Sequence, residues 1–306
     1  MSAFSLSARS RVVAATATGL VLLAAAVPAR AGVDGCSLQL DQAPQAVRVD
    51  YDPFLPATAP TRLAFRLRNG GEARCEADLA FVDVPGQPLI RTGVGATGLM
   101  LEIRPGPSVS RSPEPAVFRT AVEAGETQEI VFDVLVIEDA VVQAGLYDQS
   151  LTLEVRQPGA PQAYERSPVI IDLTALPRAQ MNLSGARGAF GAGPSISVVD
   201  FGEAQTGKTH QLFVQTRTNA SARLTFSSAN RGKLRHEQGG EAAAVLTYAV
   251  AFDGDVLDLS QVATRDVDPP RTFAGQSYGL LLTLGAVEGG PAGVYSDELT
   301  IEISTL

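Results

Sequence analysis

One glycine-rich segment has the residue types of a nucleotide-binding loop. Gly202–Thr209 reads GEAQTGKT and matches the phosphate-loop pattern G-x-x-x-x-G-K-[ST] letter for letter. That loop binds phosphates when a strand precedes it and a helix follows, because the helix N-terminus supplies N–H groups. Here the following residues, His210–Thr218, alternate between polar and apolar as a strand does. We therefore interpret the segment as a turn that joins two strands, and we predict no nucleotide site.

A second pattern, G-x-G-x-x-G, is formed by Gly93, Gly95 and Gly98. It is typical of dinucleotide-binding proteins, in which the glycine-rich turn opens a helix. Leu99–Ile103 is instead strand-like and is soon followed by Pro105, so the helix that this chemistry requires is missing. We interpret these glycines as a loop.

Side chains that commonly bind metals or catalyse reactions are few. His210 and His236 are the only histidines, and neither has a cysteine or a second histidine at ligand spacing. Asp253 and Asp255 flank a glycine, which is typical of a solvated turn. No nucleophile elbow and no Ser/His/Asp set stands out among the serines. The sequence therefore predicts no cofactor and no metal site, and it does not indicate an enzyme.

The two cysteines predict a disulfide. Cys36 and Cys75 lie 39 residues apart and are the only cysteines of the chain. In an oxidising compartment such a pair is expected to be bonded. Closing a loop of that length contributes roughly 3–4 kcal/mol in the chain-entropy description.

Residues 1–31 predict export. Arg9 and Arg11 form a basic start, Val12–Val27 is apolar and rich in small residues, and Ala29-Arg30-Ala31 fits a cleavage site. A membrane anchor is the weaker interpretation, because the apolar run is shorter than the roughly 20 residues that span a bilayer. Cleavage removes three arginines and no acid, so the formal charge changes from −9 to −12. A chain this acidic is a poor candidate for nucleic acid or an anionic membrane.

Short alternating runs between glycine and proline turns predict an all-β protein built of sandwiches. A repeat divides it in two, because Ala144–Arg156, AGLYDQSLTLEVR, returns as Ala292–Ser304, AGVYSDELTIEIS. We predict an N-terminal domain over residues 32–177 and a C-terminal domain over residues 178–306.

The two copies differ in the residues that come after them. After the first comes another strand-like run, Pro168–Leu176, whereas the chain stops at Leu306 after the second. We therefore expect the C-terminal sandwich to lack its last strand. The unpaired strand would leave an apolar groove, for which we predict the lining residues Leu299, Ile301, Ile303, Met181 and Leu183.

Several short motifs, taken in order, resemble the spore coat protein U domain, which subunits of archaic chaperone–usher pili share. They cover nearly all of the chain after residue 31, as two copies. The second copy departs from the first in having no cysteines, and Phe201-Gly202 stands where the first has Tyr51-Asp52. The motifs are Cys36, Tyr51-Asp52-Pro53, Cys75, Asp200-Phe201-Gly202, Ser228-x-Asn230-x-Gly232-x-Leu234, Tyr248 through Gly254, and Ala292-Gly293-x-Tyr295-x-Asp297.

The resemblance implies a fold, partners and a location. The fold would be two immunoglobulin-like sandwiches, the second lacking its last strand. A periplasmic chaperone would fill the groove first, an outer-membrane usher would export the subunit, and an adjacent pilin would then donate a strand. Gly32–Gly35 is too short to be a donor strand, so the chain would occupy the pilus tip at the cell surface, as a two-domain adhesin does.

In such an adhesin the N-terminal domain would present loops to a surface. Exposed apolar side chains in loops can bind hydrophobic surfaces, and an alternative is that most of them pack under their own loops. The candidates are Phe54, Leu55, Leu89, Ile90, Leu99 and Met100.

Two other functions are compatible with the sequence. One is a periplasmic pilus chaperone, which also has two immunoglobulin-like domains but donates a strand and is not expected to repeat the Ala-Gly-x-Tyr turn. The other is an exported coat or matrix protein that never exchanges strands. An enzyme is a more distant third alternative.

Overall fold

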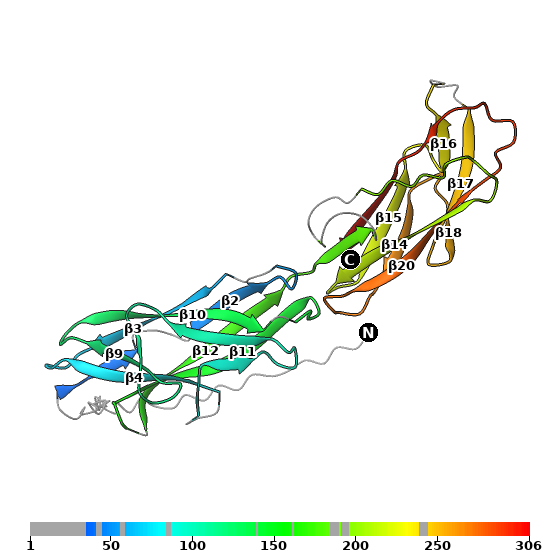
Figure 1. The fold of residues 1–306 in the computed structure, drawn as a ribbon. Helices are drawn as coiled ribbons and strands as arrows, with labels where there is room; N and C mark the ends of the chain where they lie inside the picture. Colours follow the sequence, from blue (N-terminus) through cyan, green and yellow to red (C-terminus); the bar gives the residue numbers. More distant parts are fainter. Residues whose placement is uncertain are drawn as a thin grey trace, which may run out of the picture.

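The computed structural model describes most of the chain beyond the predicted signal segment, which lies outside the described residues. The described residues are 35–40, 45–55, 59–83, 87–138, 140–160, 162–183, 190, 196–238 and 244–306. Within them the regular structure is β-strand, and there is no α-helix, as the alternating pattern predicts. None of these residues belongs to a helix that could cross a membrane. The molecule consists of two immunoglobulin-like sandwiches that follow one another end to end (Figure 1).

The N-terminal sandwich contains two sheets. The first has the order β1-β3-β10-β7-β6, and the second has the order β2-β12-β11-β4-β9-β8, with β5 beside β4. Neighbouring strands such as β3 and β10 or β11 and β12 run antiparallel, whereas β2 and β12 run parallel. The strands are β1 Leu38–Leu40, β2 Gln45–Tyr51, β3 Thr61–Asn69, β4 Cys75–Val82, β5 Pro88–Leu89, β6 Arg91–Gly93, β7 Met100–Pro105, β8 Ser110–Arg111, β9 Phe118–Val122, β10 Thr127–Glu138, β11 Gly145–Arg156 and β12 Ala163–Ala175.

The C-terminal sandwich repeats this plan. One sheet has the order β13-β14-β20-β17-β16-β21, with β18 beside β17, and the other has the order β19-β15-β22. The strands are β13 Ala179–Leu183, β14 Thr209–Thr218, β15 Ala222–Ser228, β16 Lys233–His236, β17 Val245–Phe252, β18 Asp255–Leu257, β19 Ala263–Val267, β20 Gln276–Leu284, β21 Tyr295–Ser296 and β22 Leu299–Thr305.

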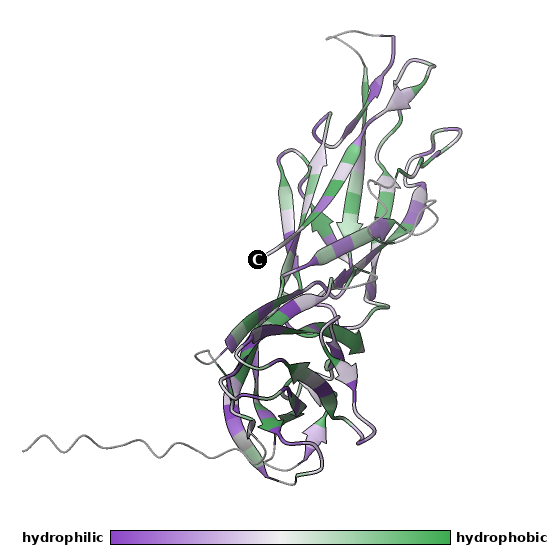
Figure 2. Ribbon diagram, turned by 90° about the vertical axis from the view of Figure 1, so that its left-hand side faces the viewer, coloured by the Kyte–Doolittle hydropathy of each residue, from purple (hydrophilic) through white to green (hydrophobic). Residues whose placement is uncertain are grey.

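The N-terminal core is closed on both sides. Inward residues of β3 alternate with outward arginines, so Leu63, Phe65 and Leu67 are buried. Phe81 and Phe132 meet edge to face across the two sheets, with ring centroids 4.9 Å apart. Green and purple segments alternate along the strands of both sandwiches (Figure 2). Each sandwich has its own cluster of buried apolar side chains.

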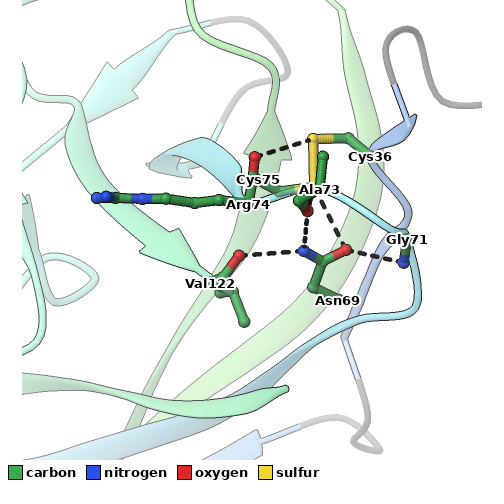
Figure 3. The surroundings of a disulfide bond; sticks show 7 residues. All are labelled: Cys36, Asn69, Gly71, Ala73, Arg74, Cys75 and Val122. Carbon is green, nitrogen blue, oxygen red and sulfur yellow. Dashed lines mark hydrogen bonds between the residues drawn. A yellow bond between two sulfur atoms is a disulfide. The ribbon is translucent and has the colours of Figure 1, made fainter. Parts of the chain in front are cut away.

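The predicted disulfide between Cys36 and Cys75 is formed (Figure 3). Beside it lies Asn69, which is fully buried. Its amide nitrogen donates to the carbonyls of Ala73 and Val122, and its amide oxygen accepts from the N–H of Gly71 (Figure 3). The disulfide and this side chain together hold the ends of β3, β4 and β9.

Both glycine-rich segments lie between strands, as the sequence predicts. Gly202–Thr209 leads into β14, and Gly93, Gly95 and Gly98 belong to the hairpin that joins β6 to β7. The predicted turn after Phe252 is also formed, with φ of 50° at Asp253 and 92° at Gly254. Two successive residues with positive φ are typical of a two-residue hairpin turn.

The two sandwiches meet at a polar junction centred on Asn219, in the turn between β14 and β15. Asn219 is fully buried. Its amide oxygen accepts from the N–H of Arg178, and its amide nitrogen donates to the carbonyl of Leu176. Its own carbonyl accepts from the N–H of Ala144, 2.8 Å away. One side chain of the C-terminal sandwich therefore satisfies backbone groups of the linker, and its backbone bonds the N-terminal sandwich.

The loop after β2 completes the junction. Asp52 forms an ion pair with Arg178, and the guanidinium of Arg217 lies 4.7 Å from the centre of the Phe54 ring. Burial lowers the pKa of Arg217, whose Nε donates to Gln180. The assignment of Phe54 to an adhesive surface stays a prediction, and the structure places its half-buried ring against Arg217 of the second sandwich.

Removing the disulfide tests how much it stabilises its own domain. We expect the double variant Cys36→Ser and Cys75→Ser to lose about 3–4 kcal/mol of N-terminal-domain stability, because the unfolded loop regains its freedom. Urea unfolding followed by domain-specific probes measures this. The C-terminal transition serves as the internal control, and an unchanged N-terminal transition would contradict the expectation.

The junction can be tested with two neighbouring residues. Phe54→Ala removes a cation–π contact of about 0.5–2 kcal/mol, and we expect it to broaden the distances between spin labels at exposed positions Arg111 and Val262. Leu55→Ala is the matched control, because the Leu55 side chain is 57% exposed. Equal distance distributions in both variants would show that Phe54 does not hold the two sandwiches together.

Candidate strand-binding groove

The sequence repeat is also a structural repeat. Tyr147 and Tyr295 occupy equivalent places in the two copies, 148 residues apart. The hydroxyl of Tyr147 donates to the carbonyl of Gln143 at 2.8 Å, and that of Tyr295 donates to the carbonyl of Pro291 at 2.8 Å. Both tyrosines thus bond the fourth residue before them and fix the same turn. The residues after the tyrosines can therefore be compared position by position.

The strands after these tyrosines differ in how they are paired. In the N-terminal sandwich, β11 lies between β12 and β4, with Leu153 opposite Phe81. In the C-terminal sandwich, β22 has Ile301 opposite Phe226 of β15, which is the counterpart of β4. On the side that corresponds to β12, no strand of the described chain pairs with β22. Within the described chain, that edge presents backbone N–H and C=O groups that no strand pairs with.

A second unpaired segment faces the same space. In the N-terminal sandwich, β2 runs parallel to β12 and ends at Tyr51. Its counterpart is the segment 196–201, which ends at Phe201. This segment is not assigned to a strand, and it forms no backbone–backbone hydrogen bond with the rest of the described chain. The side chains of Ile196 and Val198 are 84% and 87% exposed. The counterparts of both neighbours of β12 are therefore present in the second sandwich, and in the described chain no strand pairs with either on the side that faces this space.

An apolar groove of about 1290 Å³ lies between these two segments. Residues Leu212, Leu280 and Leu282 of the larger sheet line it, and the segment 196–204 borders it. β22 forms another wall of the groove. Its side chains alternate between half-buried and exposed, as the pleat of a strand requires, so every second residue faces the groove side. A groove of this size and composition can take several apolar side chains from an added strand.

The predicted groove residues occupy different parts of this space. Leu299 and Ile301 of β22, and Met181 and Leu183 of β13, line the groove. Ile303 is on the same face of β22 and packs against the core, but it is not among the lining residues. The open part of the groove therefore lies beside the start of β22, away from the junction.

The groove also contains a polar contact that sequence reasoning missed. Asp297 lies between β21 and β22, and its Oδ2 accepts from the hydroxyls of Tyr248 at 2.6 Å and Ser228 at 2.5 Å. Its Oδ1 accepts from the N–H of Asn230 at 2.8 Å. Burial, together with the bond to Asp297, raises the pKa of the Tyr248 hydroxyl far above its ordinary value. All four residues belong to motifs that carry the family resemblance, but those motifs do not reveal that they meet.

The Asp297 contacts lie at the point where the strand of the second repeat copy is interrupted. β11 is continuous over Gly145–Arg156, whereas its counterpart divides into β21 and β22, which belong to different sheets. Tyr248 lies on β17 of the larger sheet, so its bond to Asp297 crosses between the two sheets at the groove. This bond holds the start of β22 at a fixed place.

The two histidines do not form a metal site in the described part of the chain, which contains no group of three metal-binding side chains. The His236 ring lies edge to face with Tyr295, with centroids 5.0 Å apart. It also covers Gly293, where an added Cβ would lie 2.0 Å from Nε2. His210 lies 6.4 Å from the Phe201 ring, centroid to centroid.

The predicted surface-binding residues of the N-terminal sandwich are mostly not exposed. The prediction for Leu99 is wrong, because its side chain is 1% exposed and belongs to the core. Leu89 and Ile90 are half-buried against that core, and Met100 is half-buried as well. Among the six predicted residues, Leu55 alone is strongly exposed. The prediction for Leu99 failed because its side chain packs into the core, a contact between distant segments that the sequence pattern does not reveal.

Comparisons with known proteins find structural likenesses only. No family model matches the chain, and no curated protein matches its sequence. A chain of the Csu chaperone–tip subunit pre-assembly complex of Acinetobacter baumannii is 12% identical, with a TM-score of 0.46 and coverage of 87% of this chain and 99% of that chain. CfaE, the adhesive subunit of CFA/I fimbria of enterotoxigenic Escherichia coli, is 14% identical, with a TM-score of 0.38 and coverage of 86% and 93%.

The CupB6 tip adhesin from Pseudomonas aeruginosa is 15% identical, with a TM-score of 0.32 and coverage of 87% of this chain and 94% of that chain. Since all three TM-scores lie below 0.5, we draw no function from them.

Replacing Tyr248 tests the bond that crosses the groove. We expect Tyr248→Phe to destabilise the C-terminal sandwich by about 1.5–3 kcal/mol, because a hydrogen bond to a charged group is lost. Tyr295→Phe is the matched control, since its hydroxyl bonds a neutral, exposed carbonyl, and we expect about 0.5–1.5 kcal/mol for it. Thermal unfolding compares the two, and a larger loss for Tyr295→Phe would contradict this ranking.

Proposed function

We propose that this protein is a strand-accepting subunit of an exported surface fibre, and that another polypeptide completes its C-terminal sandwich. One observation carries the proposal. In the part of the chain that the structure describes, one edge of β22 has no partner strand and lies beside an apolar groove, whereas its counterpart β11 is covered by β12. A strand added at this place would pair with backbone groups that are otherwise open and would bury the groove.

The first sandwich supplies a template for the added strand. β12 runs antiparallel to β11 and parallel to β2. We therefore infer that the occupant runs antiparallel to β22 and parallel to the segment 196–201. In β12 the inward side chains Val169, Ile171 and Leu173 are fully buried. The occupant would place apolar side chains at the same alternate positions.

The energy available from this insertion is large. Burying about five apolar side chains could contribute roughly 10 kcal/mol before entropy costs, which is an upper estimate. A subunit without the strand would expose this surface and a sheet edge that invites aggregation. This requirement supports the partners that the resemblance implies. We propose that a periplasmic chaperone protects the groove, that an outer-membrane usher exports the subunit, and that an adjacent pilin finally fills it.

We further propose that the chain stands at the fibre tip and that its N-terminal sandwich makes the adhesive contact. The resemblance to two-domain adhesins supports the location. The end of this sandwich opposite the junction consists of exposed turns, and two of them are joined by the ion pair of Arg74 and Glu123. The exposed residues there include Glu72 and Glu126, so this end favours polar contacts with a target.

The strand-accepting function can be tested by fusing a strand to the chain. A copy of Pro168–Leu176, joined after Leu306 through a short glycine-serine linker, should fold into the groove, because it already covers the equivalent site. We expect the C-terminal unfolding transition to rise by several kcal/mol, up to the roughly 10 kcal/mol estimated from burial. Chemical denaturation of the fused and unfused full chains measures the difference.

The control fusion carries aspartate at the three positions that correspond to Val169, Ile171 and Leu173. It keeps the length and linker but loses the apolar face, so it should leave the transition unchanged. Equal stability of the unfused chain and both fusions would refute the strand-accepting function. It would favour an exported coat or matrix protein that does not exchange strands.

A further inference from the structure

One polar place in the groove, at Asp297, lies on the path of the added strand. Asp297 belongs to the same alternate set of positions as Leu299 and Ile301, whose side chains line the groove. In the first sandwich its counterpart is Gln149, which lies directly opposite Ile171 of β12. A strand inserted in the β12 register would therefore place one inward side chain directly opposite Asp297. Cβ atoms of such pairs lie about 4.5–5.5 Å apart.

The opposite wall contributes a second polar group. Tyr248 lies opposite Leu284 on β20, and the equivalent pair in the first sandwich is Ile103 opposite Val134. Ile103 is buried among apolar side chains. The C-terminal sandwich thus has a tyrosine and a carboxylate at positions where the first sandwich has isoleucine and glutamine.

Asp297 has room for one more hydrogen bond. An ionised carboxylate has about four acceptor positions. Within the described chain, three donors reach this one, namely Tyr248 and Ser228 at Oδ2 and the Asn230 N–H at Oδ1. No cationic side chain forms an ion pair with Asp297 in the described residues.

The remaining charges around the groove have the same sign. Among the described residues that line it, the charged side chains are Asp200, Glu203, Asp297 and Glu298, and there is no lysine or arginine. An acidic groove attracts a basic or neutral segment and repels an acidic one. This charge complementarity restricts which strands can enter.

We propose that Asp297 and Tyr248 form a selectivity subsite, which favours a hydrogen-bond donor such as lysine, threonine or asparagine over an acidic side chain at the strand position opposite Asp297. The inference rests on the proposed strand-accepting function and adds the chemistry of the partner strand. A lysine or threonine there fills the remaining acceptor position of Asp297. An aspartate or glutamate brings a like charge into a partly dry space, which is destabilising.

Peptides built on β12 test this directly. Four fluorescent peptides keep the sequence of Ser167–Ala175 but carry lysine, threonine, isoleucine or aspartate at the position of Ile171. Binding to the full-length protein is measured by fluorescence anisotropy at low and high salt. We expect the lysine peptide to bind at least tenfold more tightly than the aspartate peptide, a difference of about 1.4 kcal/mol. Threonine should match or exceed isoleucine, and the lysine preference should shrink as salt rises.

Asp297→Asn identifies the residue responsible, because it keeps the shape of the side chain and one acceptor oxygen but removes the charge. We expect the ratio of lysine to aspartate affinities to fall below about threefold in this variant, with its fold checked by circular dichroism. A matched control places lysine or aspartate at the outward position of Ile170. A side chain at the Ile170 position would lie opposite Glu298, which is exposed. Because water screens this charge, the lysine and aspartate peptides of the control pair should differ little in affinity.

The outcomes separate the two proposals. If none of the four peptides binds, the strand-accepting function fails and the subsite fails with it. If all four bind within threefold of one another, strand acceptance stands and the selectivity subsite is overturned. A lysine preference that persists undiminished in Asp297→Asn would also overturn the role of Asp297. If that variant does not fold, the ratio and its salt dependence in the unaltered protein decide the question.

Discussion

A strand that shows apolar side chains on one face and free backbone groups along one edge needs a covering strand. The N-terminal sandwich meets this need itself, because β12 lies between β2 and β11 and buries Val169, Ile171 and Leu173 completely. The C-terminal sandwich contains the counterparts of both neighbours but no strand between them in the described chain. The groove and its apolar lining result from this difference, and the proposed partner strand would remove it.

The junction relates the two sandwiches to each other. Asn219 bonds the linker at Leu176 and Arg178, and its carbonyl reaches Ala144 at the start of the β11 turn. The C-terminal end of β22 lies close by, since Leu306 bonds the carbonyl of Ser221 (Figure 1). The open part of the groove is therefore at the other end of β22. A partner strand can enter there without disturbing the contacts that join the two sandwiches.

Much of this architecture could be predicted from the sequence, because it depends on local patterns. The alternation of apolar and polar residues predicts the strands, and the 148-residue repeat predicts two equivalent turns with a tyrosine. Two cysteines in a chain with an export-type start predict the disulfide. Contacts between distant segments could not be predicted in the same way. Leu99 belongs to the loop of the β6–β7 hairpin and packs into the core, and Phe54 meets Arg217 from the other sandwich. Likewise, Tyr248 and Asp297 are 49 residues apart and meet only across the sheets.

The central claim is that β22 has an open edge that another strand can close. Hydrogen–deuterium exchange of the full chain tests it most directly, because it reports the protection of each strand separately. We expect the amides of Leu299–Thr305 that do not bond β15 to exchange rapidly, and to become protected when a peptide with the β12 sequence is added. The amides of β11 should be protected throughout. Full protection of β22 without any added strand would contradict the claim.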